Sequence, residues 1–395
     1  MKTNRNAVIV SAVRTPIGSI SGVFSGVPAT KLGSVALAEA LRRVRVPGAR
    51  VDQVYMGCVL PAGLGQAPAR QAARGADLPF SVPATTVNKV CGSSLMTVIM
   101  AAQAIRLGEA TIVAAGGMES MTGAPYLLER ARQGYRFGHA ELIDSLIKDG
   151  LWDVYNDFHM GDGGELCAAK YGLTREQLDD FTLESYRRAR HAMATGAFKQ
   201  EIVPVEVSQR KGPPRVVAED EEPNRVDLAK LRTLKPIFKP DGLLTVGNSP
   251  NCNDGAAALV VMADDEADGL GLTPLARIVN YAGAAIDPAW FTLAPIHAIR
   301  ALLDKTGLTV HDIDLFEINE AFSAVSIAVN RELALDPAKV NVNGGAVALG
   351  HPIGATGARI LTTLLYAMEA RSARRGIASL CIGGGEALAI LVERP

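Results

Sequence analysis

The same strand, helix and strand pattern occurs near both ends of the chain, and this repeat limits the folds open to it. Near the N-terminus, a strand-like run leads to Cys91, a helical pattern follows, and residues 111–115 form an apolar strand pattern that ends in two glycines. Near the C-terminus, residues 340–343 are expected to form a strand that leads to a glycine-rich loop. A helix is then expected at about 355–370 and the matching strand at 377–381. The pattern favours an α/β fold built from two similar halves.

The middle of the chain has a different character. From residue 119 to 249 strand patterns thin out, and proline, glycine and charged residues increase. One amphipathic helix is predicted there, with Thr174 as N-cap, Gln177 three residues later, and an apolar stripe. That stripe consists of Leu178, Phe181 and Leu183. We expect an N-terminal half at 1–118, completed by about 250–270, an inserted loop domain at 119–249, and a C-terminal half at 271–395.

A lone thiol, Cys91, lies where the first strand-like run gives way to a helix. Backbone N–H groups and the helix dipole at such a position stabilise a thiolate, so a pKa below the usual value of about 8.5 is expected. A free cysteine is more often a small buried apolar residue, and position alone favours that structural reading.

Three later segments change this interpretation. Asn319 begins an Asn-Glu-Ala-Phe run, His351 lies in a glycine-rich loop, and Cys381 precedes three glycines. A histidine can accept the thiol proton, a second cysteine can transfer protons, and an amide can donate to an oxygen that gains negative charge. Each segment alone is a weak signal. Because all four residues follow strand patterns, where ligands of open α/β sheets collect, their co-occurrence indicates one active site.

At these residues, and over its full length, the sequence resembles the thiolase family. Further matching motifs are Arg-Thr-Pro-Ile-Gly at 14–18, Gly-Leu-Gly-Gln at 63–66, Gly-Gly-Met-Glu-Ser-Met at 116–121 and Asn-Asp-Gly-Ala at 253–256. The resemblance implies the thiolase fold: two similar βαβαβαββ halves packed as a five-layer αβαβα core, plus an inserted loop domain.

The resemblance also implies a role for each candidate residue. Cys91 would be the nucleophile that accepts the acyl group, His351 the base that activates it, and Cys381 the acid/base for the α-proton of the substrate. Asn319, through a water, and His351 would hold one thioester oxygen. The backbone N–H groups of Cys91 and Gly383 would hold the other.

Substrate-binding residues are implied in the same way. The inserted domain would cover the pantetheine arm of CoA and contribute to a homotetramer, with His159 near the CoA arm and Met160 near the acyl group. Ser249 lies beside a proline that replaces a serine found near the pantetheine in many members. Phe291 stands where many short-chain members have methionine, so we expect a pocket for two-carbon or small branched acyl groups. Arg225, one of several basic residues in the insertion, is a candidate for the CoA phosphates, although solvated surface charge is the commoner role.

We therefore expect an acetyl-CoA C-acetyltransferase activity: condensation of two acetyl-CoA to acetoacetyl-CoA plus CoA, and the reverse thiolysis, through an acetyl group on Cys91. One alternative is a broader 3-ketoacyl-CoA thiolase of fatty-acid breakdown. Another is a non-catalytic acyl-CoA- or lipid-binding relative. The related ketosynthases pair their cysteine with two histidines, whereas this chain offers His351 with Asn319 and Cys381.

Composition excludes several other classes. Forty basic and 41 acidic residues give a net charge of −1, which argues against nucleic-acid or membrane partners. Five cysteines and six histidines show no metal-ligand spacing, so neither a metal site nor a disulfide framework is expected. Glycine motifs for dinucleotides or a P-loop are missing, so no cofactor is expected beyond the CoA thioester substrates. No leader precedes the first strand and no apolar run looks long enough for a membrane span, which favours the cytoplasm.

Overall fold

The computed structural model describes residues 5–395. The first four residues, on which the expectation about a leader partly rests, lie outside the described residues. The N-terminal half contributes, in order across its sheet, strands β4 (Ala84–Val87), β3 (Gln53–Gly57), β5 (Ile112–Ser120), β12 (Asn253–Ala263) and β1 (Ala7–Arg14). The C-terminal half contributes β13 (Ala276–Ala285), β16 (Glu386–Glu393), β15 (Arg375–Ile382) and β14 (Leu315–Ile318).

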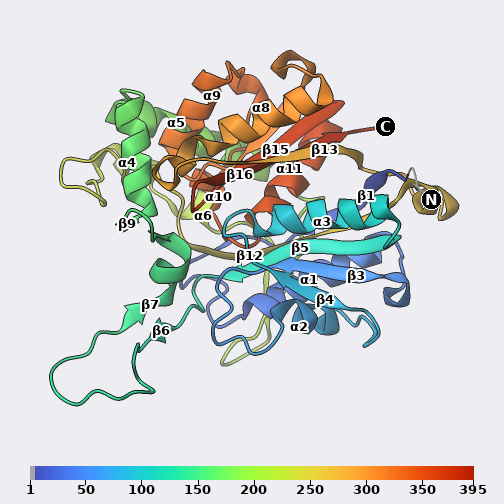
Figure 1. Cartoon of the computed structure of the whole chain (residues 1–395), viewed down its shortest axis with the longest axis horizontal. Helices are drawn as coiled ribbons and strands as arrows, with labels where there is room; N and C mark the ends of the chain where they lie inside the picture. The colour runs from blue at the N-terminus through green and yellow to red at the C-terminus, as the bar shows by residue number, and fades with distance from the viewer. Residues whose placement is uncertain (1–4) are drawn as a thin grey trace.

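These strands and their helices form five layers (Figure 1). Helices α1 (Ala29–Arg43) and α2 (Pro68–Gly75) cover the outer face of the N-terminal strands, and α3 (Ser93–Leu107) and α11 (Thr356–Ala370) pack together between the two groups of strands. Helices α8 (Ala294–Thr306) and α9 (Ser323–Glu332) lie on the far side of the C-terminal strands. Every residue of β1, β5 and β12 is buried because helices cover both faces. The expected αβαβα arrangement is confirmed.

The repeat seen in the sequence is also present in space. Strands β3, β5, β12 and β1 occupy the same order as β14, β15, β16 and β13, and α3 corresponds to α11. The two halves join through a short antiparallel pairing of β1 with β13 at Val8 and Ile9. Helices α3 and α11 are in close contact, because a Cβ on Gly357 would collide with the backbone of Leu95. The amide of Ala358 also donates to Ser94 Oγ at 2.9 Å.

The strand expected at 340–343 is not formed. Only Val340 makes a bridge, to Phe316 of β14. Asn341 has a φ of +46°, which takes the chain out of the extended region, and its side chain replaces the missing strand. Its Oδ1 accepts from the amide of Ile318 and its Nδ2 donates to the carbonyl of Ile318, both at 2.8 Å.

Two other expectations about helices need correction. One stretch, Val90–Leu107, is long and apolar enough for a membrane span by length and composition, contrary to expectation. It coincides with α3, which is apolar all round because it packs between the two groups of strands.

Helix α5 (Arg175–Thr195) has the expected capping box of Thr174 and Gln177. Its buried face contains Leu178, whereas Phe181 and Leu183 are partly exposed.

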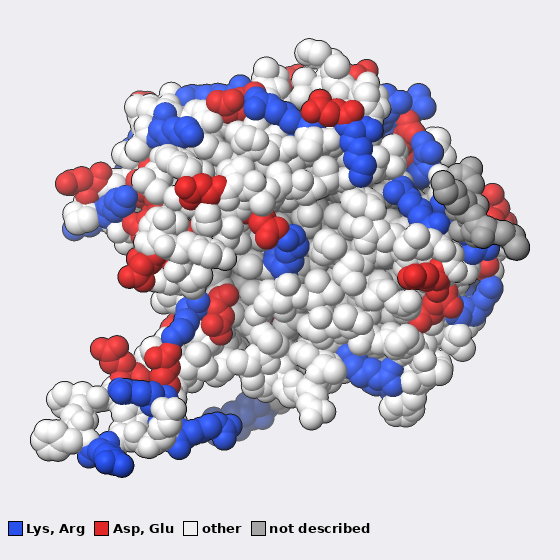
Figure 2. All heavy atoms as spheres, viewed as in Figure 1, with Lys and Arg blue, Asp and Glu red and all other residues white. Residues whose placement is uncertain are grey.

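The chain leaves the core at the end of β5 and returns at the start of β12. This long excursion contains α4 (Met160–Lys170), α5, α6 (Glu222–Arg225), the 3-10 helix η3 (Leu228–Thr233) and the π-helix η2 (Leu146–Leu151). It also contains three two-stranded ribbons, β6 (Tyr126–Leu127) with β7 (Ile143–Asp144), β8 (Trp152–Asp153) with β9 (Phe158–His159), and β10 (Val205–Val207) with β11 (Arg215–Val217). Residues 128–142, which we call the arm, project from the body beyond β6 and β7 (Figure 1). Basic and acidic side chains are interspersed on the face shown in Figure 2.

The remaining elements are short. They are β2 (Gly18–Ser19), α7 (Asp264–Gly269), α10 (Ala346–Leu349) and the 3-10 helices η1 (Gly48–Arg50), η4 (Pro288–Leu293), η5 (Val310–Asp312) and η6 (Pro337–Lys339).

Candidate active site

Cys91 lies on a tight turn between β4 and α3. The preceding Val90 has a φ of +46°, a conformation that costs a β-branched residue about 1–3 kcal/mol. Neighbouring side chains hold the turn: Asn88 Oδ1 accepts from the amide of Val90 at 3.0 Å, and Ser93 Oγ donates to the carbonyl of Val90 at 2.6 Å. The same Ser93 Oγ accepts from the amide of Lys89 at 2.9 Å. The turn therefore fixes the position of the thiol.

His351 lies in the loop between α10 and α11, and its tautomer follows from its hydrogen bonds. The hydroxyl of Thr356 donates its one proton to the carbonyl of Pro352 at 2.9 Å. It can therefore only accept from His351 Nδ1, which lies 2.7 Å away. With the proton on Nδ1, the Nε2 atom of His351 carries a free lone pair. The imidazole is thus prepared to act as a base.

Burial shifts the pKa values of both His351 and Cys91, and the pKa of Cys91 differs from the sequence-based expectation. Burial, together with the positive charge of Arg359, lowers the pKa of His351 to about 3. Burial raises the pKa of Cys91 to about 11, although the backbone N–H groups of Gly383 and Cys91 act in the opposite direction. The expected low thiol pKa at the start of α3 is therefore wrong, because desolvation outweighs the helix and backbone dipoles. In the resting site the thiol is protonated and the imidazole is neutral.

Cys381 lies near the end of β15 on the same cavity. Burial, followed by the nearby sulfur of Cys91, raises the pKa of its thiol well above the usual value. The chain then turns through Gly384 and Gly385, with φ of +91° and +88°. The preceding Gly383 directs its backbone N–H toward the Cys91 sulfur. Two sulfurs and a backbone donor thus meet at one place.

Asn319 follows β14 and is 1% exposed. Its backbone amide donates to the carbonyl of Ser379 at 2.9 Å. Neither its Oδ1 nor its Nδ2 has a hydrogen-bond partner among residues 5–395. A buried amide left without partners costs about 1–3 kcal/mol, so it needs an explanation. The neighbouring Glu320, in contrast, is fully engaged with Asn341, Ser185 and the amide of Val347.

One cavity brings most of the predicted residues together. It is lined by Cys91, His351, Cys381, Gly383, His159, Met160, Phe291 and Ser249. Asn319 is not on its surface, but Ala321 and Phe322 of the same turn are. Sequence reasoning missed other lining residues, including Leu151, Phe238, Cys252 and Ile353. These residues carry only an apolar signal in the sequence, which does not distinguish a pocket wall from the core.

Arg225 does not line this cavity. It ends α6, its side chain is 57% exposed, and it pairs with Glu221 at 3.4 Å. Its assignment to the CoA phosphates stays a prediction from the sequence.

His159 caps the first turn of α4 and faces the cavity. Its Nδ1 accepts from the amide of Gly161 at 3.0 Å, so the ring carries its proton on Nε2. The ring stacks on Phe238, with centroids 5.0 Å apart. Within residues 5–395 the Nε2–H has no hydrogen-bond partner, so it is a donor on the cavity wall.

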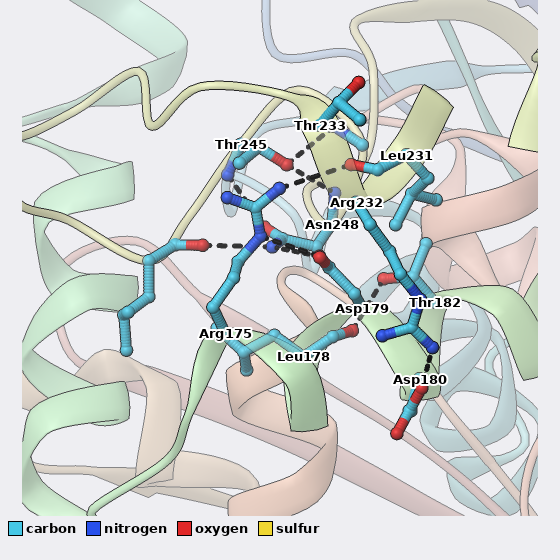
Figure 3. Close-up of polar contacts among 12 residues, drawn as sticks. Arg175, Leu178, Asp179, Asp180, Thr182, Leu231, Arg232, Thr233, Thr245 and Asn248 are labelled. Atoms are coloured by element: carbon cyan, nitrogen blue, oxygen red, sulfur yellow. Dashed lines mark hydrogen bonds and ion pairs between the residues drawn. The ribbon is translucent and has the colours of Figure 1, made fainter. Parts of the chain in front are cut away.

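A cluster on α5 holds the cavity loop at 243–249 (Figure 3). Asn248 Nδ2 donates to Asp179 Oδ1 at 3.1 Å, and Asn248 Oδ1 accepts from the amide of Thr245 at 2.8 Å. Arg175 Nε in turn binds Asp179 at 2.8 and 3.0 Å. The carbonyl of Asn248 accepts from the amide of Ser323, the first residue of α9. The loop that supplies Ser249 is therefore anchored to two helices.

Two carboxylates join the catalytic loops across the halves. Glu119, at the end of β5, accepts from the backbone amides of Gly354 at 2.9 Å and Val59 at 3.0 Å. This fixes the His351 loop to the N-terminal half. Glu386 forms an ion pair with Lys89, two residues before Cys91. That pair ties the nucleophile turn to the glycine loop after Cys381.

Comparison with known proteins agrees with this geometry. The family model described as "Thiolase, N-terminal domain" matches residues 7–265, and "Thiolase, C-terminal domain" matches residues 272–394. The chain belongs to the thiolase family. This thiolase is 50% identical to the acetyl-CoA acetyltransferase of Pseudomonas aeruginosa over 391 residues, which cover 99% of this chain and 100% of the relative. It is 49% identical over 392 residues to that of Schizosaccharomyces pombe, covering 99% of each chain.

A solved structure gives the same result for the fold. The crystal structure of the Bacillus anthracis acetyl-CoA acetyltransferase superimposes with a TM-score of 0.97 at 40% identity, and each chain is covered completely. The thiolase fold expected from the sequence is confirmed.

Proposed function

We propose that this thiolase is an acetyl-CoA C-acetyltransferase, which condenses two acetyl-CoA to acetoacetyl-CoA and CoA and catalyses the reverse thiolysis. The observation that carries the proposal is the meeting of Cys91, His351, Cys381 and the Gly383 amide on one cavity. Relatives of about 50% identity over nearly the whole chain carry the name acetyl-CoA acetyltransferase, which supports it.

In the first half-reaction, Cys91 Sγ attacks the thioester carbonyl while its proton passes to His351 Nε2. A thiol with a pKa of about 11 and an imidazole with a pKa of about 3 do not form a stable ion pair. The proton transfer therefore accompanies the attack. The backbone N–H groups of Cys91 and Gly383 stabilise the negative oxygen, and the proton leaves on CoA.

In the second half-reaction, the thiol proton of Cys381 passes to His351 Nε2, and the Cys381 thiolate then takes the α-proton of the second acetyl-CoA. When the thioester on Cys91 breaks, its sulfur takes the proton from His351, so all three groups return to their starting protonation states. The unpartnered amide of Asn319, through a water, and His351 would hold the enolate oxygen.

We also propose a cytoplasmic homotetramer that needs no cofactor beyond its CoA substrates. The inserted segment, from which His159 and Met160 reach the cavity, would cover the pantetheine arm. The arm exposes apolar side chains, among them Leu128, Phe137 and Leu142, which a second copy of the chain could bury.

A chain-length series tests the substrate. We expect kcat/KM for thiolysis to be highest with acetoacetyl-CoA and to fall at least tenfold for a ten-carbon 3-ketoacyl-CoA. Equal or higher kcat/KM on the long substrate would favour the broad-range thiolase. Intact-mass measurement after mixing with acetyl-CoA tests the non-catalytic alternative, since a binding protein gains no covalent acetyl group.

The tautomer of His351 gives a second prediction. Thr356→Val removes the acceptor for Nδ1–H, and we expect kcat/KM to fall about 10- to 100-fold, the range found for partners that orient metal-bound imidazoles. Thr356→Ser keeps the hydroxyl and should stay within about threefold of wild type. Rates of acetyl-enzyme formation by rapid quench provide the measurement. Equal rates for the two variants would contradict the assigned tautomer.

A further inference from the structure

Helix α4 presents a glycine-rich surface to the cavity wall. Three of its first five residues are glycine, and each lies against a bulky apolar side chain: Gly161 against Phe238, Gly163 against Phe291, and Gly164 against Leu244 and Phe322. Glycine is among the least favourable residues inside a helix. Its repeated use here is explained by the close approach of these side chains to the helix backbone.

Gly161 makes a closer contact, but the ring of Phe238 that it meets is already stacked on His159. Gly163 meets Phe291, whose ring stacks on no other ring among residues 5–395. A Cβ at Gly163 would lie 2.5 Å from Cε1 and 3.3 Å from Cδ1 of Phe291, too close for either group to stay in place. Phe291 belongs to η4 and is 3% exposed. It packs in one apolar cluster with Met160 and Cys381, and it also lines the substrate cavity.

The direction in which this ring can move is restricted. Phe291 packs within a buried apolar cluster, and protein interiors are close-packed, so the cluster resists a displaced ring. The open side is the cavity, where the Met160 sulfur lies near Gly383, 3.5 Å from the position of a Cβ there. A side chain at residue 163 would therefore displace Phe291 into the cavity that Cys381 also lines.

We propose that Gly163 and Phe291 form a coupled pair that sets the depth of the acyl pocket and restricts this enzyme to short 3-ketoacyl-CoA substrates. Phe291 is the specificity-determining wall, and Gly163 is the positioning residue behind it. The inference rests on the proposed acetyl-CoA acetyltransferase function. The sequence alone indicated only that Phe291 narrows the site.

The test compares kcat/KM for thiolysis of acetoacetyl-CoA and 3-ketohexanoyl-CoA. Phe291→Ala should raise the six-carbon to four-carbon ratio at least tenfold, since one or two methylenes in an apolar pocket are worth about 10- to 200-fold. Gly163→Ala should lower kcat/KM on acetoacetyl-CoA at least tenfold. Combining it with Phe291→Leu should return kcat/KM to within about threefold of Phe291→Leu alone, the non-additivity expected of a contact pair.

Gly269 offers a matched control. It lies in α7, and a Cβ there meets nothing within 4 Å, so Gly269→Ala should leave both substrates within about twofold of wild type. Thermal unfolding of each variant separates misfolding from a change of selectivity, and the Phe291→Ala ratio does not depend on Gly163→Ala folding. An unchanged ratio in Phe291→Ala, or strictly additive effects in the double variant, would overturn the inference while wild type still thiolyses acetoacetyl-CoA. A wild type without that activity would instead contradict the proposed function.

Discussion

Cys91→Ala is expected to lose acetyl-enzyme formation completely and to lower kcat for thiolysis by about four orders of magnitude or more. Alanine fits the tight turn at Val90 without adding atoms, so the fold should survive. The reaction has no other route, because the acyl group must wait on the protein while CoA is exchanged. Intact-mass spectrometry after mixing with acetyl-CoA, followed by peptide mapping, checks the result.

Cys167→Ala is the matched control. Cys167 is also buried, in α4, and its thiol lies 3.7 Å from the carbonyl of Ala324, but it does not line the cavity. This variant should still take up one acetyl group. A stable acetyl group that maps to Cys252 or Cys381 in the wild-type protein would refute Cys91 as the nucleophile.

Cys381→Ala should separate the two half-reactions. Acetylation of Cys91 should continue at a rate within about tenfold of wild type, because the thiol, His351 and the Gly383 amide are still present. Condensation should fall by about three orders of magnitude or more, since Cys381 is the group proposed to take the α-proton. Exchange of acetyl-CoA α-protons in D2O, measured beside acetyl uptake, reports the two steps independently.

The pH dependence sharpens this experiment. With a pKa of about 3, His351 stays neutral throughout the range from pH 5 to 8. Acetylation by Cys381→Ala should therefore show no loss toward pH 5 that follows imidazole protonation. Normal condensation by this variant would disprove the proton-transfer role of Cys381.

Much of this architecture was predictable because its signals are local. A strand, a reactive residue and a helix follow each other directly at Cys91, and the same order recurs before α11. Hydrophobic periodicity reports such units, and a repeated unit implies two similar halves. The failure at residues 340–343 has the same local origin, because the apolar alternation there looks like a strand while Asn341 turns the backbone away.

The features that the sequence did not predict depend on distant partners. The pKa of Cys91 is set by desolvation in a cavity whose other walls come from residues hundreds of positions away. The tautomer of His351 could not be predicted from the sequence, because it follows from the hydrogen bond that the Thr356 hydroxyl donates to the carbonyl of Pro352. Gly163 gave no functional signal, since its importance lies in the ring of Phe291 that touches it.

Helices α3 and α11 determine how far apart the nucleophile and the base are held. Cys91 and His351 stand just ahead of these two equivalent helices, and their spacing is set where Gly357 meets the backbone of Leu95. The distance between Cys91 and His351 is thus set by a buried contact between two helices rather than by surface loops. A substitution that widened this helix crossing would therefore move the nucleophile and the base apart, although it lies outside the cavity itself.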